Sequence, residues 1–297
     1  MKYLYLNGKY KSVKSEFSFP MLQSFNYGTA AFEGMKAFYR KCERNWYLFR
    51  PDQHYNRLKR AAGLIDIRLD FNRSQFIKII SRLIRKNNVR SDIYIRPIVY
   101  RDNKGVGLTR PSGSGFSIYL QSTPPRTPGK FSCCLVSQRR PTDGTFNVKL
   151  VGNYLLSYFA QKEATAKKFD LGILLSSDGF LSEASLMNLF FIKNNRVYTP
   201  SMDCGPLDGI TRKSVIQIIR EQLGLSVSEG KYRWSRLECA DEIFLTGTGS
   251  GINFISRLGK RKFNLKNRNL IGKKVWSIYN DVIYGKNNLY NIWLVEI

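Results

Sequence analysis

Lys149 is a residue whose position in the sequence could do chemistry. It opens KLVGNYLL, residues 149 to 156, on a predicted strand that runs into Gly152, Asn153 and Tyr154. Gly152 permits a sharp turn, and Tyr154 can place its phenol on the lysine's side of that turn. A lysine held against a pocket wall can form a Schiff base with an aldehyde. An exposed lysine at a strand end is the alternative that this stretch leaves open.

A carboxylate in apolar surroundings is the second candidate. Glu183 stands between two strand-like runs in LSEASLMNLFFI. A buried carboxylate needs a partner, because an unpaired buried charge is costly. The protonated ring nitrogen of pyridoxal phosphate would serve, since that cofactor needs a carboxylate there to act as an electron sink. A structural ion pair is the alternative.

Two turns have the composition of anion sites. In DGITRKSV, Gly209 precedes a predicted helix that opens with Ile210 and Thr211, where free N–H groups and the helix dipole attract a phosphate. In LTGTGSGI, residues 245 to 252, a strand ends in a turn whose N–H groups and hydroxyls could face an oxyanion. A helix capped by Thr211 and a plain loop are the alternatives. Together, the four candidates match the requirements of pyridoxal phosphate.

Alternating strand-like and helix-like segments must position these residues. Residues 72–88 repeat apolar side chains at helical spacing, and residues 92–100 are β-branched and aromatic, as in a strand. This is an α+β or mixed α/β pattern. We expect further strands at 45–50, 131–137, 172–177, 188–200 and 242–248, and further helices at 51–65, about 153–168 and 211–224.

The best candidate for a linker is STPPRTPGK, residues 122–130. It holds three prolines and one glycine in nine residues. We therefore predict a small N-terminal α/β domain at 1–121, a linker at 122–130 and a larger C-terminal cofactor-binding domain at 131–297.

Composition bounds the class of protein. The chain has 297 residues, of which 43% are hydrophobic, enough for a packed core. It has no apolar run long enough for a transmembrane helix, and residues 1–17 suggest two strands around a glycine turn rather than a signal peptide. Five cysteines without a C-x-x-C pair argue against a disulfide framework, and the single histidine, His54, argues against a zinc site. We expect a cytoplasmic protein without a metal.

The net charge of +26 leaves open a basic, non-catalytic protein that binds nucleic acid or an anionic membrane. The basic residues are scattered through the chain, however, and no helix-turn-helix, RRM or zinc motif accompanies them. A lysine-rich solvated surface is the interpretation that we favour.

The order and spacing of these motifs resemble the branched-chain amino-acid aminotransferases, within a group that also holds D-amino-acid aminotransferases and aminodeoxychorismate lyases. The resemblance covers nearly the whole chain. The family's K-x-x-G-N-Y implies that Lys149 forms the Schiff base and that Tyr154 touches the cofactor's phenolic oxygen. SEASLMNLF matches the motif whose glutamate, here Glu183, faces the pyridine nitrogen.

The resemblance also implies phosphate ligands. The family's G-I-T-R matches Gly209 to Arg212 and implies contacts from Ile210 and Thr211, and TGTG implies one from Thr248. The family's H-x-x-R-L implies that Arg57 binds the phosphate, with His54 as a packed structural residue.

Substrate contacts follow from the same resemblance. FNYGTAAFEGMKAF and YIRP match substrate-binding segments of the family, and residues 104–108 match a loop that reaches the neighbouring subunit's active site. The implied side-chain pocket contains Tyr27 and Phe32, and the implied carboxylate contacts are Tyr94, Arg96, Gly249 and Ser250.

The implied fold has two domains with the cofactor between them, and the implied enzyme transaminates Leu, Ile and Val with 2-oxoglutarate in a ping-pong cycle. A homodimer or higher homo-oligomer is expected. Gly249-Ser250-Gly251 stands where the family often has Ala-Ala-Glu, and Asn253-Phe254 replaces a common Thr-Pro. These departures keep a D-amino-acid transaminase, an amine transaminase or a lyase on the same fold as alternatives.

Overall fold

The computed structural model describes residues 1–15, 20–108 and 113–297, which form two compact units. Unit 1 comprises Met1–Pro125, Val148–Gly152 and Val282–Ile297, and unit 2 comprises Arg126–Asn147 and Asn153–Asp281. The first break falls inside the predicted linker, 122–130. Residues 148–152 and 282–297 belong to unit 1 by their contacts, although the predicted boundaries place them C-terminal to the linker. The division into domains at 1–121 and 131–297 stays a prediction.

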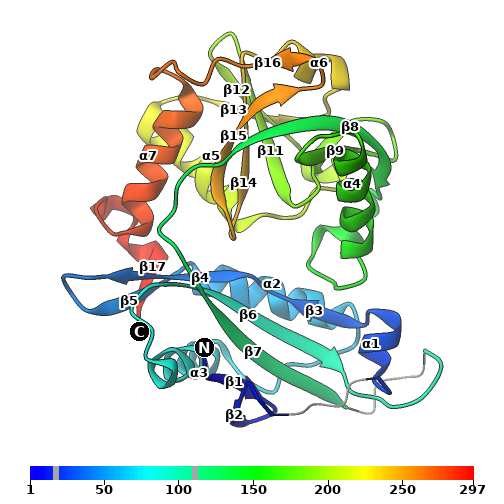
Figure 1. The fold of residues 1–297 in the computed structure, drawn as a ribbon, viewed down its shortest axis with the longest axis vertical. Helices are drawn as coiled ribbons and strands as arrows, with labels where there is room; N and C mark the ends of the chain where they lie inside the picture. Colours follow the sequence, from blue (N-terminus) through cyan, green and yellow to red (C-terminus); the bar gives the residue numbers. More distant parts are fainter. Residues whose placement is uncertain (16–19, 109–112) are drawn as a thin grey trace. The chain divides into compact units, whose positions relative to one another are not determined.

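Unit 1 is built on one antiparallel sheet. Its strands are β1 (Tyr3–Leu6), β2 (Lys9–Ser12), β3 (Ala30–Phe32), β4 (Met35–Arg40), β5 (Asn45–Phe49), β6 (Asp92–Arg101), β7 (Ser114–Thr123) and β17 (Leu294–Glu296). Its helical segments are α1 (Gln23–Tyr27), α2 (Pro51–Gly63), α3 (Arg73–Asn87) and the 3-10 segment η3 (Asn288–Trp293). The strand order is β17-β5-β4-β6-β7-β1-β2, with β3 beside β6 (Figure 1). The strand pair predicted near the N-terminus is confirmed, except that its residues 16 and 17 lie outside the described residues.

The two longer helices of unit 1 begin where their sequences indicate. Pro51 opens α2 at a position that needs no N–H partner. At α3, the Gln75 N–H donates to Asn72 Oδ1 at 2.9 Å and the Asn72 N–H donates to Gln75 Oε1 at 2.8 Å, a reciprocal capping box. Apolar side chains of both helices pack with β4, β5, β6 and β7 in one core. The predicted helices at 51–65 and 72–88 are confirmed.

Unit 2 contains a mostly antiparallel sheet that closes on itself. Its strands are β8 (Lys130–Arg140), β9 (Leu171–Ser176), β10 (Leu181–Ala184), β11 (Met187–Lys193), β12 (Arg196–Pro200), β13 (Val227–Gly230), β14 (Glu242–Gly247), β15 (Gly251–Leu258) and β16 (Arg261–Lys262). The order is β10-β9-β8-β15-β14-β11-β12-β13, and β10 also pairs with β11, which closes a barrel. The interior holds apolar side chains such as Leu189, Leu245 and Ile255.

Helices flank this barrel (Figure 1). They are α4 (Tyr154–Ala166), α5 (Ile210–Leu223), α6 (Trp234–Glu238) and α7 (Ile271–Ile283), with the 3-10 segments η1 (Thr145–Asn147) and η2 (Met202–Cys204). Ala160 and Ala164 of α4 pack against Cys134 and Val136 of β8. The predicted helices at about 153–168 and 211–224 are confirmed as α4 and α5, and the predicted strands at 131–137, 172–177 and 242–248 as β8, β9 and β14. The predicted strand at 188–200 is instead two antiparallel strands, β11 and β12, because the chain reverses at Asn194 and Asn195, which both have positive φ.

Three further observations concern cysteines, membrane spans and metal sites. All five cysteines are free, and Cys133, Cys134 and Cys204 are buried. In the part of the chain that the structure describes, no helix is both long and apolar enough to cross a membrane. The same residues contain no group of three or more acidic, cysteine or histidine side chains placed to hold a metal ion.

Candidate active site

The segment that carries Lys149 lies beside β3 in unit 1. The Phe32 N–H donates to the Lys149 carbonyl at 3.0 Å, and the Val151 N–H donates to the Ala30 carbonyl at 2.8 Å. Residues 148–152 are thus a short extended segment fixed by backbone hydrogen bonds. Lys149 itself is half-buried, which argues against a simple exposed strand end.

Gly28 lets this segment approach the end of α1 closely. Gly28 ends α1 with φ of 68°, a left-handed conformation that favours glycine. A Cβ atom on Gly28 would lie 3.1 Å from the Cα of Gly152, so a side chain at position 28 would push the backbones apart, whereas a Cβ atom on Gly152 would lie 3.8 Å from the Gly28 carbonyl oxygen, an ordinary contact. The contact places Gly28 of the NYG motif beside Gly152 of the GNY motif, both in unit 1. Sequence reasoning predicted a turn at Gly152 and missed this packing.

Phe32 links Lys149 to the predicted carboxylate contacts. The Lys149 Nζ lies 5.1 Å from the centroid of the Phe32 ring, and the Arg96 guanidinium carbon lies 4.3 Å from it. Arg96 also donates from Nη2 to the Tyr94 hydroxyl at 2.6 Å. Tyr94 and Arg96 share one face of β6, as their spacing predicts. An aromatic wall, an amine and a guanidinium therefore meet in unit 1.

Tyr27 is the last residue of α1 and contacts the 104–108 loop. Its side chain is 41% exposed, and its hydroxyl accepts a hydrogen bond from the Gly107 N–H at 2.9 Å. The Gln23 side chain donates to the Gly107 carbonyl at 2.6 Å. These contacts tie α1 to the 104–108 loop, so Tyr27 takes its position from that loop.

Arg57 belongs to a buried charged cluster. Its Nε and Nη2 donate to the two carboxylate oxygens of Glu33 at 2.6 and 2.8 Å, and His54 Nδ1 lies 2.7 Å from Glu33 Oε2. Burial alone would raise the pKa of Glu33, but Arg57 and His54 outweigh it and hold that pKa well below its usual range. Burial lowers the pKa of His54, so the imidazole is neutral at neutral pH and donates from Nδ1. The predicted phosphate arginine is thus oriented by a glutamate that sequence reasoning left without a role.

Glu183 forms the corresponding cluster in unit 2. Arg140 donates from Nε to its Oε1 at 2.8 Å, and Nη2 contacts the same oxygen. The Leu207 N–H and the Asn188 amide donate to Oε2 at 3.1 and 3.3 Å. Glu183 therefore forms the structural ion pair that its sequence allowed, with Arg140 as the partner. It also has the buried setting that a carboxylate facing a ring nitrogen would require.

A row of polar side chains crosses three strands next to Glu183. Glu183 pairs with Asn188, and Asn188 pairs with Thr246, so the three lie across β10, β11 and β14. Leu189 and Leu245, their neighbours in sequence, point into the barrel, so the row lies on the outer face. The Thr246 Oγ1 is buried and has no hydrogen-bond partner among the described residues.

The start of α5 is packed against this row. A Cβ atom on Gly209 would lie 2.0 Å from Asn188 Oδ1, so only glycine fits before the helix. Ile210 and Thr211 then open α5 and are 4% and 2% exposed. The first turn of a helix leaves backbone N–H groups without intrahelical partners. These residues have the geometry of an anion site beside Glu183.

The remaining predicted residues lie at chain reversals in unit 2. Tyr154 begins α4 and is half-buried. Thr248, Gly249 and Ser250 form the turn between β14 and β15. The Ser250 Oγ accepts a hydrogen bond from Asn253 Nδ2 at 3.0 Å. The turn is thus a hairpin end, as its composition predicts.

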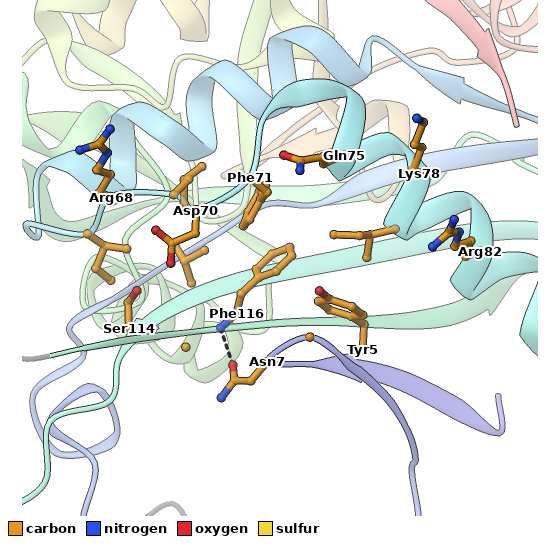
Figure 2. Close-up of a pocket in the computed structure, with 16 residues that line it drawn as sticks. Tyr5, Asn7, Arg68, Asp70, Phe71, Gln75, Lys78, Arg82, Ser114 and Phe116 are labelled. Atoms are coloured by element: carbon orange, nitrogen blue, oxygen red, sulfur yellow. Dashed lines mark hydrogen bonds between the residues drawn. The ribbon is translucent and has the colours of Figure 1, made fainter.

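A cavity of about 460 Å³ in unit 1 is a separate feature (Figure 2). Tyr5, Phe71 and Phe116 point into it, and the exposed basic side chains of Lys78 and Arg82 stand at its rim. It also includes Val99, on the face of β6 opposite Tyr94 and Arg96. Among the described residues that line it, none is a predicted site residue. The cavity is therefore not the candidate active site.

Comparisons with known proteins identify the family. The chain matches the class IV amino-transferase family over residues 30–258 and belongs to that family. A probable branched-chain-amino-acid aminotransferase of Aquifex aeolicus (strain VF5) is 32% identical over 100% of this chain and 97% of its own length.

Solved structures agree. Branched-chain aminotransferase from Thermoproteus uzoniensis with norvaline has a TM-score of 0.91 and 29% identity, over 99% of this chain and 98% of that one. The enzyme from Thermobaculum terrenum in its pyridoxal-phosphate form has a TM-score of 0.92 and 27% identity, over the same shares. The predicted class IV fold, the aminotransferase activity and the cofactor, pyridoxal 5′-phosphate, are thereby confirmed.

The residues present fit this cofactor. A phosphate calls for cationic and N–H donors; unit 1 contains the cationic Arg57, and unit 2 contains the N–H groups of the first turn of α5. A ring nitrogen calls for a carboxylate, and Glu183 is held in place by three donors. The buried Thr246 hydroxyl is a further polar group without a described partner. Glu33, Arg140, Asn188 and Thr246 are the residues that sequence reasoning missed. All but Arg140 lay in quoted motifs, but none of them was given a role.

Proposed function

We propose that the chain is a pyridoxal-phosphate-dependent transaminase of the branched-chain L-amino acids Leu, Ile and Val, with 2-oxoglutarate as the amino acceptor. The observation that carries the proposal is the amine of half-buried Lys149 beside the Phe32 ring, which Arg96, hydrogen-bonded to Tyr94, also contacts. The similarity to enzymes described as branched-chain aminotransferases supports the substrate class.

The proposed cofactor residues divide by role. Arg57, Ile210, Thr211 and Thr248 bind the phosphate, Glu183 faces the ring nitrogen, Tyr154 contacts the phenolic oxygen and Lys149 is the point of covalent attachment. When bound, pyridoxal phosphate supplies an electron sink for the bond broken at the α-carbon.

The residues of the chain supply the proton transfer and the substrate contacts. The Lys149 amine removes the α-proton of the amino acid and returns a proton during the reaction. Tyr94, Arg96 and the turn at Gly249 and Ser250 bind the carboxylate. Tyr27 and Phe32 form an apolar wall for the side chain, which distinguishes Leu, Ile and Val only by about 10–200-fold per methylene. The amino group leaves one amino acid as a 2-oxo acid is released, and a second 2-oxo acid takes it up.

We infer a homodimer or higher homo-oligomer in the cytoplasm. Met21, Phe25, Val106 and Leu108 are 62%, 70%, 94% and 70% exposed. The Gly105 N–H donates to the Met21 carbonyl at 3.1 Å, so these side chains gather around α1 and the 104–108 loop. Apolar groups gathered in this way favour a protein partner.

The test is the visible absorption of the purified protein with L-leucine or D-alanine, in wild type and Lys149→Ala. We expect a cofactor band that shifts with L-leucine, and loss of the transaminase rate by more than about 10²-fold in the variant. Lys162→Ala, at an exposed lysine of α4, is the matched control. A band that responds only to D-alanine or an amine would instead establish the alternative transaminases of this fold.

A further inference from the structure

Arg126, which precedes β8, lies against the turn between β14 and β15. Its Nη2 donates to the Thr248 carbonyl. Its guanidinium carbon lies 5.8 Å from the ring centroid of Tyr279, a buried residue of α7. The guanidinium is therefore held beside the turn that the proposed function assigns to the cofactor phosphate and the substrate carboxylate.

Gly251 leaves the space that Arg126 occupies. Its φ of 75° is left-handed, and an added Cβ atom would lie 2.4 Å from Arg126 Nη1 and 3.4 Å from Cδ. A side chain at 251 would therefore require the guanidinium to move away from Thr248. Gly251, which stands where the family often has Glu, thus has a physical reason; the same geometry does not explain Gly249 and Ser250.

Asn253 ties the same segment to the turn from the other side. Its Oδ1 accepts a hydrogen bond from the Gly129 N–H at 2.8 Å, and its Nδ2 donates to Ser250 Oγ at 3.0 Å. Asn253 is 2% exposed, so these bonds are shielded from water. Residues 126 and 129 are therefore both linked to the turn.

We propose that Arg126 is a positioning residue for transamination, which fixes the conformation of residues 248–251 and so sets the affinity of the enzyme for substrate carboxylates. The inference rests on the proposed function of this turn. A hydrogen bond from a guanidinium to a carbonyl is stronger than a neutral one, and its positive charge beside the turn favours an anion there.

Steady-state kinetics of Arg126→Ala and Arg126→Lys test the proposal. For Arg126→Ala we expect KM for L-leucine and 2-oxoglutarate to rise about 10- to 100-fold, because one charged hydrogen bond is lost. We expect kcat to change by less than about threefold. Arg126→Lys keeps the positive charge but loses the planar guanidinium with its several N–H donors. Its KM should therefore lie between the KM values of wild type and Arg126→Ala. Lys130→Ala, at an exposed lysine at the start of β8, should match wild type.

A double-mutant cycle with Gly251→Ala tests the contact without substrate. Arg126→Ala removes the atom that a methyl group at 251 would meet, so the two changes should be non-additive in thermal unfolding and in cofactor affinity. Additive effects, or an Arg126→Ala enzyme with wild-type KM, would overturn the proposal. A fall in kcat and unfolding temperature without a change in KM would overturn it as well. Failure of the proposed function would appear differently, as a wild-type protein that does not respond to L-leucine.

Discussion

Glu33 is the residue on which the buried charges of unit 1 depend. It is fully buried and holds Arg57 through two hydrogen bonds and His54 through one. Replacement of one member of a buried ion pair leaves the other charge uncompensated in a medium of low polarity. The geometry of the proposed phosphate arginine therefore depends on a carboxylate that need not touch the cofactor.

Glu33→Gln tests this dependence. We expect the free energy of unfolding to fall by about 3–5 kcal/mol, because Arg57 then lacks a charged partner, and the affinity for pyridoxal phosphate to fall with it. Urea denaturation and cofactor titration measure the two effects. Glu43→Gln changes an exposed pair with Arg40 and should leave both unchanged. Equal behaviour of the two variants would contradict the role of Glu33.

His54 predicts a pH dependence of stability. Burial lowers its folded-state pKa below the ordinary value of about 6.5, so at acidic pH the unfolded chain binds a proton that the folded chain does not. The contribution of neutral His54 to the free energy of unfolding is fully present above a pH of about 6.5 and is lost as the pH falls below that value. His54→Asn should flatten the slope of unfolding temperature against pH between about 5 and 6.5. His54 is the only histidine in the sequence, and an unchanged slope would exclude it as the cause.

Residue chemistry selected the groups that we propose to act directly, but not the residues that hold them in place. Lys149 and Glu183 stand out because an amine beside a turn and an acid in an apolar run each invite an explanation. Arg140 meets Glu183 across 43 residues of sequence, and Arg57 meets Glu33 across 24. Which of 48 basic residues meets a given carboxylate is decided by strand pairing and helix packing, and a single sequence does not encode those contacts locally.

At the scale of elements, local patterns were sufficient for most helices and strands. Asn72 and Gln75 mark the start of α3, and Pro51 marks that of α2. Local patterns did not predict that residues 148–152 bond to β3, or that β10 pairs with both β9 and β11. Those pairings join distant segments, and their partners are chosen by the packed core rather than by local preference.

Gly209 offers a test at this scale. In Gly209→Ala, the new methyl group would meet Asn188 Oδ1 at 2.0 Å, so either the side-chain amide or the start of α5 must move. We expect cofactor affinity to fall at least about tenfold, equivalent to about 1.4 kcal/mol. Cofactor titration followed by absorbance measures this. Gly63→Ala in α2, where a Cβ meets nothing within 4 Å, is the matched control and should retain wild-type affinity. Wild-type affinity in Gly209→Ala would contradict the packing argument.

At the scale of the whole molecule, we expect the proposed oligomer to depend on apolar surface rather than on charge. The net charge of +26 disfavours association of two copies, because the positively charged chains repel each other. The exposed apolar side chains of Phe25, Val106 and Leu108 favour association, because a contact between copies would remove them from water.

Val106→Asp combined with Leu108→Asp should weaken the proposed oligomer. We expect light scattering to show a smaller mass than wild type and the transaminase rate to fall, because the resemblance places this loop at a neighbouring active site. Ile292→Asp in η3 introduces the same charge at a residue that is 88% exposed and should leave the mass unchanged. A wild-type mass in the loop variant would remove residues 104–108 from the interface.

The position of β17 has a consequence for folding during translation. This strand completes the edge of the unit 1 sheet, where Leu294, Val295 and Glu296 pair with Phe49, Leu48 and Tyr47 of β5. A ribosome makes β5 early, but the partner of that strand emerges only after all of unit 2 has been translated. During this interval the edge of β5 has unpaired N–H and C=O groups that could pair with another nascent chain. Unit 2, whose last residue is Asp281, can complete its barrel before unit 1 completes its sheet.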